Sequence, residues 1–369
     1  MFYLFVAVFL GIAPLLQFIS GVSLWTKCPF SAGDYLRMNV MLIVCVAVYM
    51  LMSRMPGART RRVADASAHM APAYADKTLL WLSVIAFGVT VAAYRGDVVS
   101  MLWRGWALKT PIGRAAPAVG LPLTFLPEAV VAVSLMLFKL GGSGNRRTEV
   151  ILVALTLLAN WPMAVPRFQV AAVYVPLLLM YVPVATRKYV MVAVLFVMLL
   201  AVFPLMNLFR RDFTCFGVGN FLTADYDTYQ NMMEAVRGGM VTWGRQLLGV
   251  VLFFVPRAFW PGKPVGSGFC VAREYGYDYD NIAMCVFGEG YVNFGFVGMI
   301  VVSGMIAWVN IKADSRYWGG GVTTAFKVCY LIGLPMEFVI LRGALLNVLP
   351  YYLAYIFVVY VVSKISVKR

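Results

Sequence analysis

The stretch that decides the fold is FYLFVAVFLGIAPLLQFISGV, residues 2–22. It carries no charged side chain, and its length matches the roughly 20 residues that a helix needs to cross the hydrocarbon core of a bilayer. An apolar run of this length indicates a membrane-spanning helix. Because the run has neither a positively charged start nor an obvious small-residue cleavage site, we interpret it as a retained span and not as a signal peptide.

Further apolar runs follow, and together they predict an all-α polytopic membrane protein with about ten transmembrane helices. The expected spans are 2–22, 38–53, 78–94, 117–138, 149–166, 170–186, 189–207, 285–309, 323–341 and 344–362. Apolar residues make up 62% of the 369 residues and charged residues 13%, and the mean hydropathy is +0.81. These values exclude an ordinary soluble enzyme, a disordered chain and a fibrous protein. We expect one integral membrane domain over residues 1–369.

The lysines and arginines between the apolar runs predict the orientation, because they concentrate on the cytoplasmic side. One set of loops holds Arg54, Arg59, Arg61, Arg62, Lys77, Lys139, Arg146, Arg147, Arg187, Lys188, Lys312, Arg316, Lys327, Lys364, Lys368 and Arg369. The opposite short loops hold half as many: Lys27, Arg37, Arg95, Arg104, Lys109, Arg114, Arg167 and Arg342. We therefore expect cytoplasmic termini. The net charge of +15 reflects topology and lipid headgroups, and we expect no nucleic-acid partner.

One loop, residues 208–284, joins the seventh and eighth predicted spans and falls on the outer side. Its basic and acidic residues are equal in number, so any arginine that binds an anion there must do so by placement and not through a general positive charge. The apolar stretch Leu247–Val255 is too short to cross a bilayer. It predicts a re-entrant or interface-lying helix.

Two segments near the end of this loop combine unusual residues. The first is Pro256-Arg257-Ala258-Phe259-Trp260-Pro261-Gly262-Lys263-Pro264, in which three prolines fix backbone torsions and prevent a continuous helix. The second is Phe287-Gly288-Glu289-Gly290-Tyr291-Val292-Asn293-Phe294-Gly295-Phe296-Val297-Gly298. It places a carboxylate, a phenol and an amide at the outer mouth of the eighth span.

The pair of patterns P-R-x-x-W-P-x-K-P and G-E-x-Y-x-N-F-G-x-x-G, within residues 256–298, resembles the oligosaccharide repeat-unit polymerases, the O-antigen polymerase (Wzy) family. The resemblance implies a GT-C-like fold in the bacterial inner membrane, with an active site that faces the periplasm. Such enzymes transfer a growing glycan onto a new oligosaccharide repeat linked to undecaprenyl diphosphate. The implied partners are that lipid-linked oligosaccharide, the bilayer and a chain-length regulator protein.

The resemblance also implies outer-face cations that hold the diphosphate. The candidates by position are Arg167, Arg210, Arg257, Lys263 and Arg342. A guanidinium grips phosphate oxygens in bidentate fashion and stabilises a leaving diphosphate. The alternative is an interfacial arginine that extends its charge to the headgroups.

A base and glycan contacts complete the expected site. We expect Glu289 to act with Arg257 in catalysis by accepting the proton of the attacking hydroxyl; the alternative is an ion pair with an arginine. The glycan contacts are expected from Trp260, Tyr277, Tyr291 and Asn293. Two further carboxylates fall within predicted spans, where a charge is costly. For Glu337 we expect an ion pair with Arg342, whereas Glu128 has no evident partner.

We expect no cofactor and no metal. The triplets Asp225-Tyr226-Asp227 and Asp278-Tyr279-Asp280 are weak metal candidates in a polar, Tyr-rich loop. The single histidine, His69, falls in a predicted inner loop. Its position excludes His-based chemistry on the outer face and favours a polymerase over the related O-antigen ligases, which carry an outer-loop histidine. Cys215 and Cys270 fall in the outer loop, where we favour free thiols over a disulfide.

Three rival functions remain open from sequence. One is a flippase or exporter of a lipid-linked sugar, which is expected to carry charges deep in many spans and broken helices near the midplane. The second is an O-antigen-ligase-like transferase. The third is a non-catalytic assembly partner, for which the polar outer motifs have no use.

Overall fold

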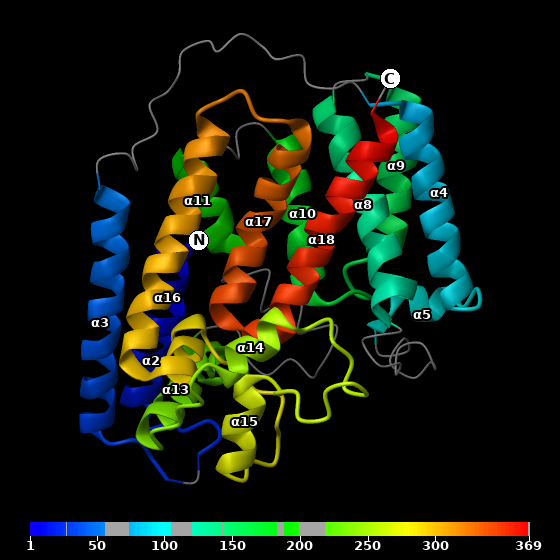
Figure 1. Ribbon diagram of the computed structural model, residues 1–369. Coiled ribbons are helices and arrows are strands. Elements are labelled where there is room, and N and C mark those ends of the chain that lie inside the picture. Colours follow the sequence, from blue (N-terminus) through cyan, green and yellow to red (C-terminus); the bar gives the residue numbers. More distant parts are fainter. Residues whose placement is uncertain are drawn as a thin grey trace. The chain divides into compact units, whose positions relative to one another are not determined.

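The computed structural model describes residues 1–26, 28–55, 74–104, 120–141, 144–182, 188–198 and 218–367. Within these ranges the chain is helical, and its only β pairing is an isolated bridge between Tyr74 and Val367 (Figure 1). Seven helical segments of the described residues are long and apolar enough to cross a membrane: Phe2–Ile19, Ala32–Arg54, Asp76–Ala93, Pro122–Gly141, Val286–Trp318, Thr324–Arg342 and Leu345–Ser366. The prediction of an all-α, multi-pass membrane protein is confirmed.

The other three predicted spans correspond to shorter helices. They are α9 (Arg146–Ala159), α10 (Arg167–Tyr181) and α11 (Lys188–Val197). At 1.5 Å per residue, the 14 residues of α9 extend roughly 21 Å, which is short of the roughly 30 Å of a hydrocarbon core. The total of ten spans stays a prediction, as does the GT-C-like arrangement.

The chain divides into two compact units, each built from three separate stretches. Unit 1 comprises Met1–Arg62, Cys215–Gly319 and Glu337–Tyr351, and unit 2 comprises Val63–Thr214, Gly320–Met336 and Tyr352–Arg369. The division falls within α17 (Thr324–Arg342) and α18 (Leu345–Ser366). The single domain expected over residues 1–369 stays a prediction.

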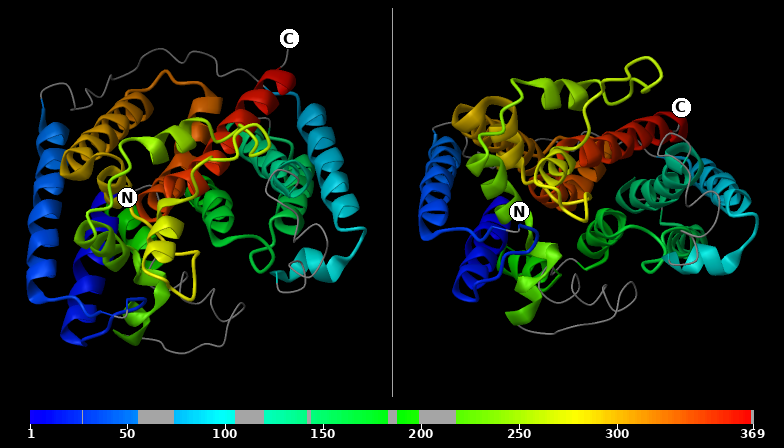
Figure 2. Two further views of the ribbon diagram at one scale, coloured as in Figure 1. Left: turned by 60° about the horizontal axis from the view of Figure 1, so that its bottom comes forward. Right: turned by 90° about the horizontal axis from the view of Figure 1, so that it is seen from below.

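Unit 1 contains the first membrane-spanning segment, α3 and α16. That segment consists of α1 (Phe2–Phe5), the π-helix η1 (Val6–Ile12) and α2 (Ala13–Ile19). Helix α3 (Ala32–Arg54) packs along α16 (Val286–Trp318) (Figures 1 and 2). The hydroxyl of Ser303 donates to the carbonyl of Cys45 across this contact. Val297, Val301 and Met305, four residues apart, are more than half exposed and form an apolar face suited to lipid.

Between α11 and α16, the described residues 218–285 form five short helices of unit 1. They are the 3₁₀ turns η5 (Val218–Leu222) and η6 (Ala224–Tyr226) and the α-helices α13 (Thr228–Arg237), α14 (Arg245–Val251) and α15 (Ser267–Glu274). Helices α13 and α14 pack against α16, and α13 also packs against α3 and α15. The three α-helices gather at the end of unit 1 where α3 and α16 begin (Figures 1 and 2). We call this end the loop end of unit 1.

Unit 2 is built around α8 (Leu126–Gly141), which follows the π-helix η2 (Leu121–Phe125). Helix α8 packs against α4 (Asp76–Ala93), α9 and α10, and the short α5 (Val98–Leu102) packs on α9. Ala86, Val131 and Ala159 form a buried cluster between α4, α8 and α9. Small side chains at this contact let the three helices approach closely.

Candidate functional site

The second sequence motif, residues 287–298, forms a break in α16. Phe294 (φ −142°, ψ 26°) and Gly295 (φ 63°, ψ −152°) leave the helical region, and the conformation of Gly295 is essentially reserved for glycine. Residues 286–293 therefore form a short arm. Residues 296–318 form a long arm of roughly 35 Å, which is sufficient by itself to cross a bilayer.

Two other glycines of the motif allow the arms to touch. A Cβ atom on Gly290 would lie 2.7 Å from the carbonyl oxygen of Gly298, and a Cβ atom on Gly298 would lie 2.0 Å from that of Gly290. In an unbroken helix, residues eight apart are separated by roughly 12 Å along the axis. The short arm therefore folds against the long arm, and only glycine fits at the contact.

The break also exposes backbone carbonyls that anchor the start of α14. The backbone N–H of Thr242 donates to the carbonyl of Val292 at 2.7 Å, and that of Gly244 donates to the carbonyl of Asn293 at 3.0 Å. The side-chain oxygen of Asn293 accepts from the backbone N–H of Leu247 at 2.8 Å. These contacts replace the intrahelical bonds that the break removes.

Glu289 lies in the short arm and is only 2% exposed. One carboxylate oxygen accepts from the hydroxyl of Ser267, the first residue of α15, at 2.8 Å. The other accepts from the backbone N–H of Leu345, the first residue of α18, at 3.1 Å. A helix start is a favourable place for a carboxylate. Among the described arginines none forms an ion pair with Glu289, and both of its oxygens have neutral partners.

The segment that directly follows the first motif contacts the second motif at this carboxylate. Pro264 packs on α14, where a Cβ atom on Gly249 would lie 3.0 Å from the proline ring. Two residues later, a Cβ atom on Gly266 would lie 3.1 Å from the side chain of Asn347 in α18. Ser267 follows directly and bonds Glu289. The end of the first motif, the short arm of α16 and the start of α18 therefore form one junction at the loop end of unit 1.

The cations of the first motif bind carbonyls of their own loop. Arg257 donates from Nη1 to the carbonyl of Lys263 at 2.7 Å and from Nη2 to that of Pro264 at 3.1 Å. Lys263 donates to the carbonyls of Phe253 and Val255 at 2.5 and 2.9 Å. Burial, together with the nearby charge of Arg257, lowers the pKa of Lys263. Arg257 is exposed, and these contacts use two of its five N–H groups.

Arg342 ends α17 and links it to η6. Its Nε and Nη2 groups donate to the carbonyl of Asp225 at 3.1 and 2.9 Å. The predicted ion pair between Arg342 and Glu337 is wrong, because the carboxylate of Glu337 accepts from the side chain of Asn310 at 2.7 Å. Side chains five residues apart on a helix do not share a face, whereas those three or four apart do.

The first D-x-D triplet is part of the internal structure of unit 1. Asp227 is 2% exposed, and one of its carboxylate oxygens accepts from the indole N–H of Trp25 at 2.9 Å. Burial raises the pKa of Asp227, and the charge of Arg342 opposes that rise. Among the described residues, no group of three or more His, Cys, Asp or Glu side chains is placed to hold a metal ion. The five described cysteines, Cys28, Cys45, Cys270, Cys285 and Cys329, are free thiols, and Cys215 lies outside the described residues.

The four residues expected to contact a glycan occupy different settings. The hydroxyl of Tyr277 donates to the carboxylate of Glu234 at 3.0 Å. Tyr291 and Asn293 are 8% and 4% exposed, and the hydroxyl of Tyr291 faces the carbonyl of Val236 at 3.5 Å. Trp260 lies half-buried in the loop of the first motif. Of the four, Trp260 is the one whose side chain is partly open to solvent and makes no hydrogen bond to another described residue.

An ion pair in α13, between a buried carboxylate and a partly exposed arginine, was not predicted from the sequence. The guanidinium of Arg237 lies 2.5 Å from the carboxylate of Glu234, and also donates to Thr26 and to the carbonyl of Cys28. Glu234 is fully buried. The spacing of three residues on a helix was the available signal.

Two further predicted diphosphate ligands are Arg167 and Arg210. Arg167 is the first residue of α10 in unit 2, and Arg210 lies outside the described residues. Their roles stay predictions. Unit 1 holds the other three candidates, Arg257, Lys263 and Arg342.

Unit 2 contains its own buried carboxylate, for which sequence analysis found no partner. Glu128 in α8 is 6% exposed and accepts from the side-chain amide of Gln169 at 2.6 Å. That amide also donates to the side chain of Asn160, whose own N–H donates to the carbonyl of Glu128. The partners come from positions 32 and 41 residues further along the chain, which explains why sequence spacing did not reveal them.

No family model, no curated protein and no solved structure matches this chain.

Proposed function

We propose that this protein is a membrane glycosyltransferase that polymerises oligosaccharide repeat units carried on undecaprenyl diphosphate, as its resemblance to the O-antigen polymerases implies. One observation carries the proposal. Glu289 of the second motif accepts hydrogen bonds from Ser267, three residues after the end of the first motif, and from the backbone N–H of Leu345. Leu345 follows Arg342 by three residues, so a carboxylate and arginine-bearing segments belong to one end of unit 1.

The reaction makes two demands that this junction can meet. The bond from the anomeric carbon of the growing glycan to the diphosphate breaks, and the diphosphate leaves with the electron pair. A hydroxyl of the incoming repeat unit forms the new glycosidic bond and loses its proton. Arg257, with Lys263 beside it, is assigned to the leaving diphosphate together with Arg342, because preorganised cations stabilise developing charge most effectively.

Glu289 is assigned to the proton. Its carboxylate already accepts a hydrogen bond from a hydroxyl, that of Ser267 at 2.8 Å, and this distance is within the range for a general base and its substrate. An acceptor hydroxyl that displaces Ser267 would form the same contact. Trp260 is assigned to the glycan, since an aromatic ring offers a face for stacking on a sugar, while Tyr277, Tyr291 and Asn293 support the surrounding structure.

The test is polymer formation by the purified protein from a purified undecaprenyl-diphosphate-linked repeat unit. The wild type is expected to give a ladder of lengthened glycans, and Arg257→Ala is expected to lose it. Arg273→Ala is the matched control, because Arg273 is an exposed arginine of the same loop region outside both motifs. Equal ladders from the Arg257→Ala and Arg273→Ala proteins would remove Arg257 from the mechanism.

A second candidate function, export of a lipid-linked sugar, is favoured by the buried polar group in unit 2. Glu128 lies in a candidate membrane-spanning helix, where an ionisable residue is costly and commonly marks a transport pathway. Movement of a fluorescent lipid-linked sugar across proteoliposomes, lost in Glu128→Gln and retained in Arg257→Ala, would favour this function over polymerisation.

A further inference from the structure

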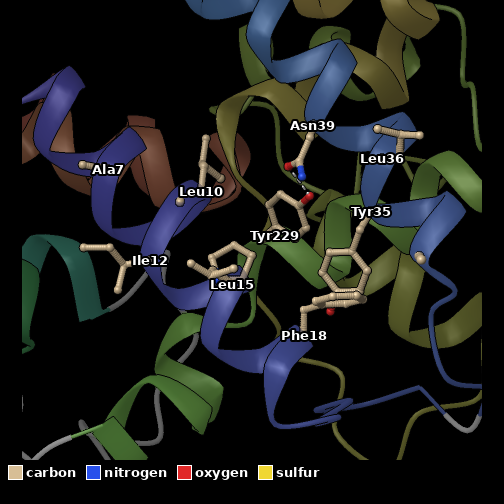
Figure 3. A pocket seen from close by; sticks show the side chains of 12 residues that line it. Ala7, Leu10, Ile12, Leu15, Phe18, Tyr35, Leu36, Asn39 and Tyr229 are labelled. Atoms are coloured by element: carbon tan, nitrogen blue, oxygen red, sulfur yellow. Dashed lines mark hydrogen bonds between the residues drawn. The ribbon is translucent and has the colours of Figure 1, made fainter.

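A groove opens in unit 1 between the first membrane-spanning segment and the start of α3 (Figure 3). Its volume is about 610 Å³, and its walls include Leu10, Leu15 and Phe18 on one side and Leu36 on the other. Leu15, Phe18 and Leu36 are 57%, 46% and 67% exposed. Both walls belong to candidate membrane-spanning helices, so we expect the groove to open sideways to lipid.

The backbone of the first segment gives this groove its depth. Val6–Ile12 is a π-helix, a local form of helix that is frequent at functional sites. Gly11 lies within it and lines the groove. A Cβ atom on Gly11 would meet nothing closer than the carbonyl of Val6 at 3.5 Å, so the space beside Gly11 is open because the residue has no side chain.

One polar pair interrupts the apolar lining. The hydroxyl of Tyr229 donates to the side-chain oxygen of Asn39 at 2.7 Å, and Figure 3 shows both side chains at the groove. Tyr229 is fully buried, whereas Asn39 is exposed. In the part of the chain that the structure describes, the amide N–H groups of Asn39 donate to no protein acceptor. An amide donor among hydrocarbon costs free energy unless it finds an acceptor.

We propose that the groove binds one acyl chain of a glycerophospholipid, with the ester carbonyl of that chain accepting a hydrogen bond from the amide of Asn39. The apolar walls fit the chain, and the volume falls within the roughly 300–1,000 Å³ of small-molecule sites. An isoprenoid chain has no acceptor along its length, so it leaves the Asn39 donor unsatisfied. The ester-linked lipid is therefore the occupant that matches both features. This proposal does not depend on the proposed function.

The first experiment uses the wild-type protein in nanodiscs and needs no substitution. A phosphatidylethanolamine with a photoactivatable diazirine in its ester-linked acyl chain is expected to label residues 7–18 and 32–39. The matched probe with an ether-linked chain lacks the carbonyl and is expected to label about fivefold less, which is the effect of one hydrogen bond. Equal labelling by the two probes, or stronger labelling by a diazirine polyprenyl phosphate, overturns the proposal.

The second experiment fills the groove. Gly11→Leu places a side chain in the open space and is expected to abolish labelling by the ester-linked probe. Gly88→Leu is the matched control, because Gly88 is an exposed glycine of another candidate span with nothing within 4 Å of a Cβ atom. Unchanged labelling of folded Gly11→Leu contradicts the proposal. If that variant does not fold, the comparison of ester and ether probes on the wild type still decides the proposal.

Discussion

Helix α13 and the loop at residues 253–264 come from the same long segment between α11 and α16, yet they differ in almost every physical respect. Residues 228–236 of α13 are all buried, although the helix is rich in polar side chains. The loop is largely open, and Phe259 within it is 84% exposed. Helix α13 therefore forms part of the core of unit 1, whereas the loop at residues 253–264 lies on its surface.

The difference lies in where each region finds hydrogen-bond partners. In α13, the amide of Gln230 donates to the side chain of Gln17 and to the carbonyl of Val22 at 3.1 and 2.8 Å. Gln17 in turn donates to the carbonyl of Tyr226. The loop instead satisfies its carbonyls with its own cations, Arg257 and Lys263. A helix rich in polar side chains can therefore form part of the core when distant segments supply its hydrogen-bond partners, whereas a loop whose cations bind its own carbonyls can stay at the surface.

The largest expected effect is the loss of the cation that pairs with the buried carboxylate of Glu234 in α13. Arg237→Met leaves the carboxylate of Glu234 buried with one phenol as its partner, and such uncompensated charges cost about 3–5 kcal/mol. Thermal unfolding in detergent micelles should show a large fall in melting temperature. Arg37→Met, at an exposed arginine of α3, should change the unfolding free energy by less than about 0.5 kcal/mol. Equal effects would mean that α13 is not core.

The next effect concerns the contact between the two arms of α16. Gly298→Ala places a Cβ atom 2.0 Å from a backbone oxygen, and overpacking of this kind costs about 1–3 kcal/mol. Gly11→Ala is the control in the same unit, since its nearest neighbour is at 3.5 Å. The unfolding free energies of the two variants, measured by denaturant titration, should differ by that amount. A tolerated Gly298→Ala would contradict the folded-back short arm.

A smaller effect is expected in the pH dependence of stability. Because burial raises the pKa of Asp227 above its ordinary value of 3.8, the folded state holds the proton more tightly than the unfolded state does. The unfolding free energy should therefore fall as pH rises from about 3.8 through the raised pKa, and then level off. Asp227→Asn should remove this part of the slope in melting temperatures recorded against pH.

The control for this titration is Asp278→Asn, at an exposed carboxylate of the same long segment. It should keep the wild-type profile. If the melting temperature of Asp227→Asn follows the wild-type pH profile throughout, the carboxylate of Asp227 does not contribute to the pH dependence of the unfolding free energy, and the prediction is wrong.

The smallest stability effect is expected in the exposed loop. Arg257→Ala removes two hydrogen bonds to carbonyls that water can replace, so the unfolding free energy should fall by less than about 1 kcal/mol. The same melting experiment measures it. A loss as large as that of Arg237→Met would assign Arg257 to the core and not to the surface that we propose for substrate.

Much of the fold was predictable from the apolar runs, because a bilayer demands length and hydrophobicity that are visible locally. The break in α16 was not predicted, although its glycines were quoted in the motif. The role of Gly290 and Gly298 becomes apparent only in the folded chain, where the short arm of α16 packs against the long arm. The partners of Glu128 were equally hidden, since Asn160 and Gln169 approach it through tertiary packing.

The candidate site was predicted in its composition and only partly in its contacts. Glu289 was selected because a carboxylate at a span mouth is unusual, but its bonds to Ser267 and Leu345 depend on three separate helices. The predicted ion pair between Glu337 and Arg342 is wrong because proximity in sequence does not place two side chains on the same helix face. Residues five apart on a helix lie on different faces. The local sequence pattern therefore indicates which residue types form the candidate site, whereas tertiary packing determines which groups they contact.

The central claim is that arginines at the loop end of unit 1 neutralise the leaving diphosphate. The most direct measurement is polymer formation from a purified undecaprenyl-diphosphate-linked repeat unit in excess chelator, comparing wild type with Arg257→Ala. The account predicts an unaffected ladder from the wild type and a rate lowered about a hundred- to a thousandfold in Arg257→Ala. The absence of any polymer from the wild type without chelator, or a reaction stopped by chelator and restored by magnesium or manganese, would contradict it.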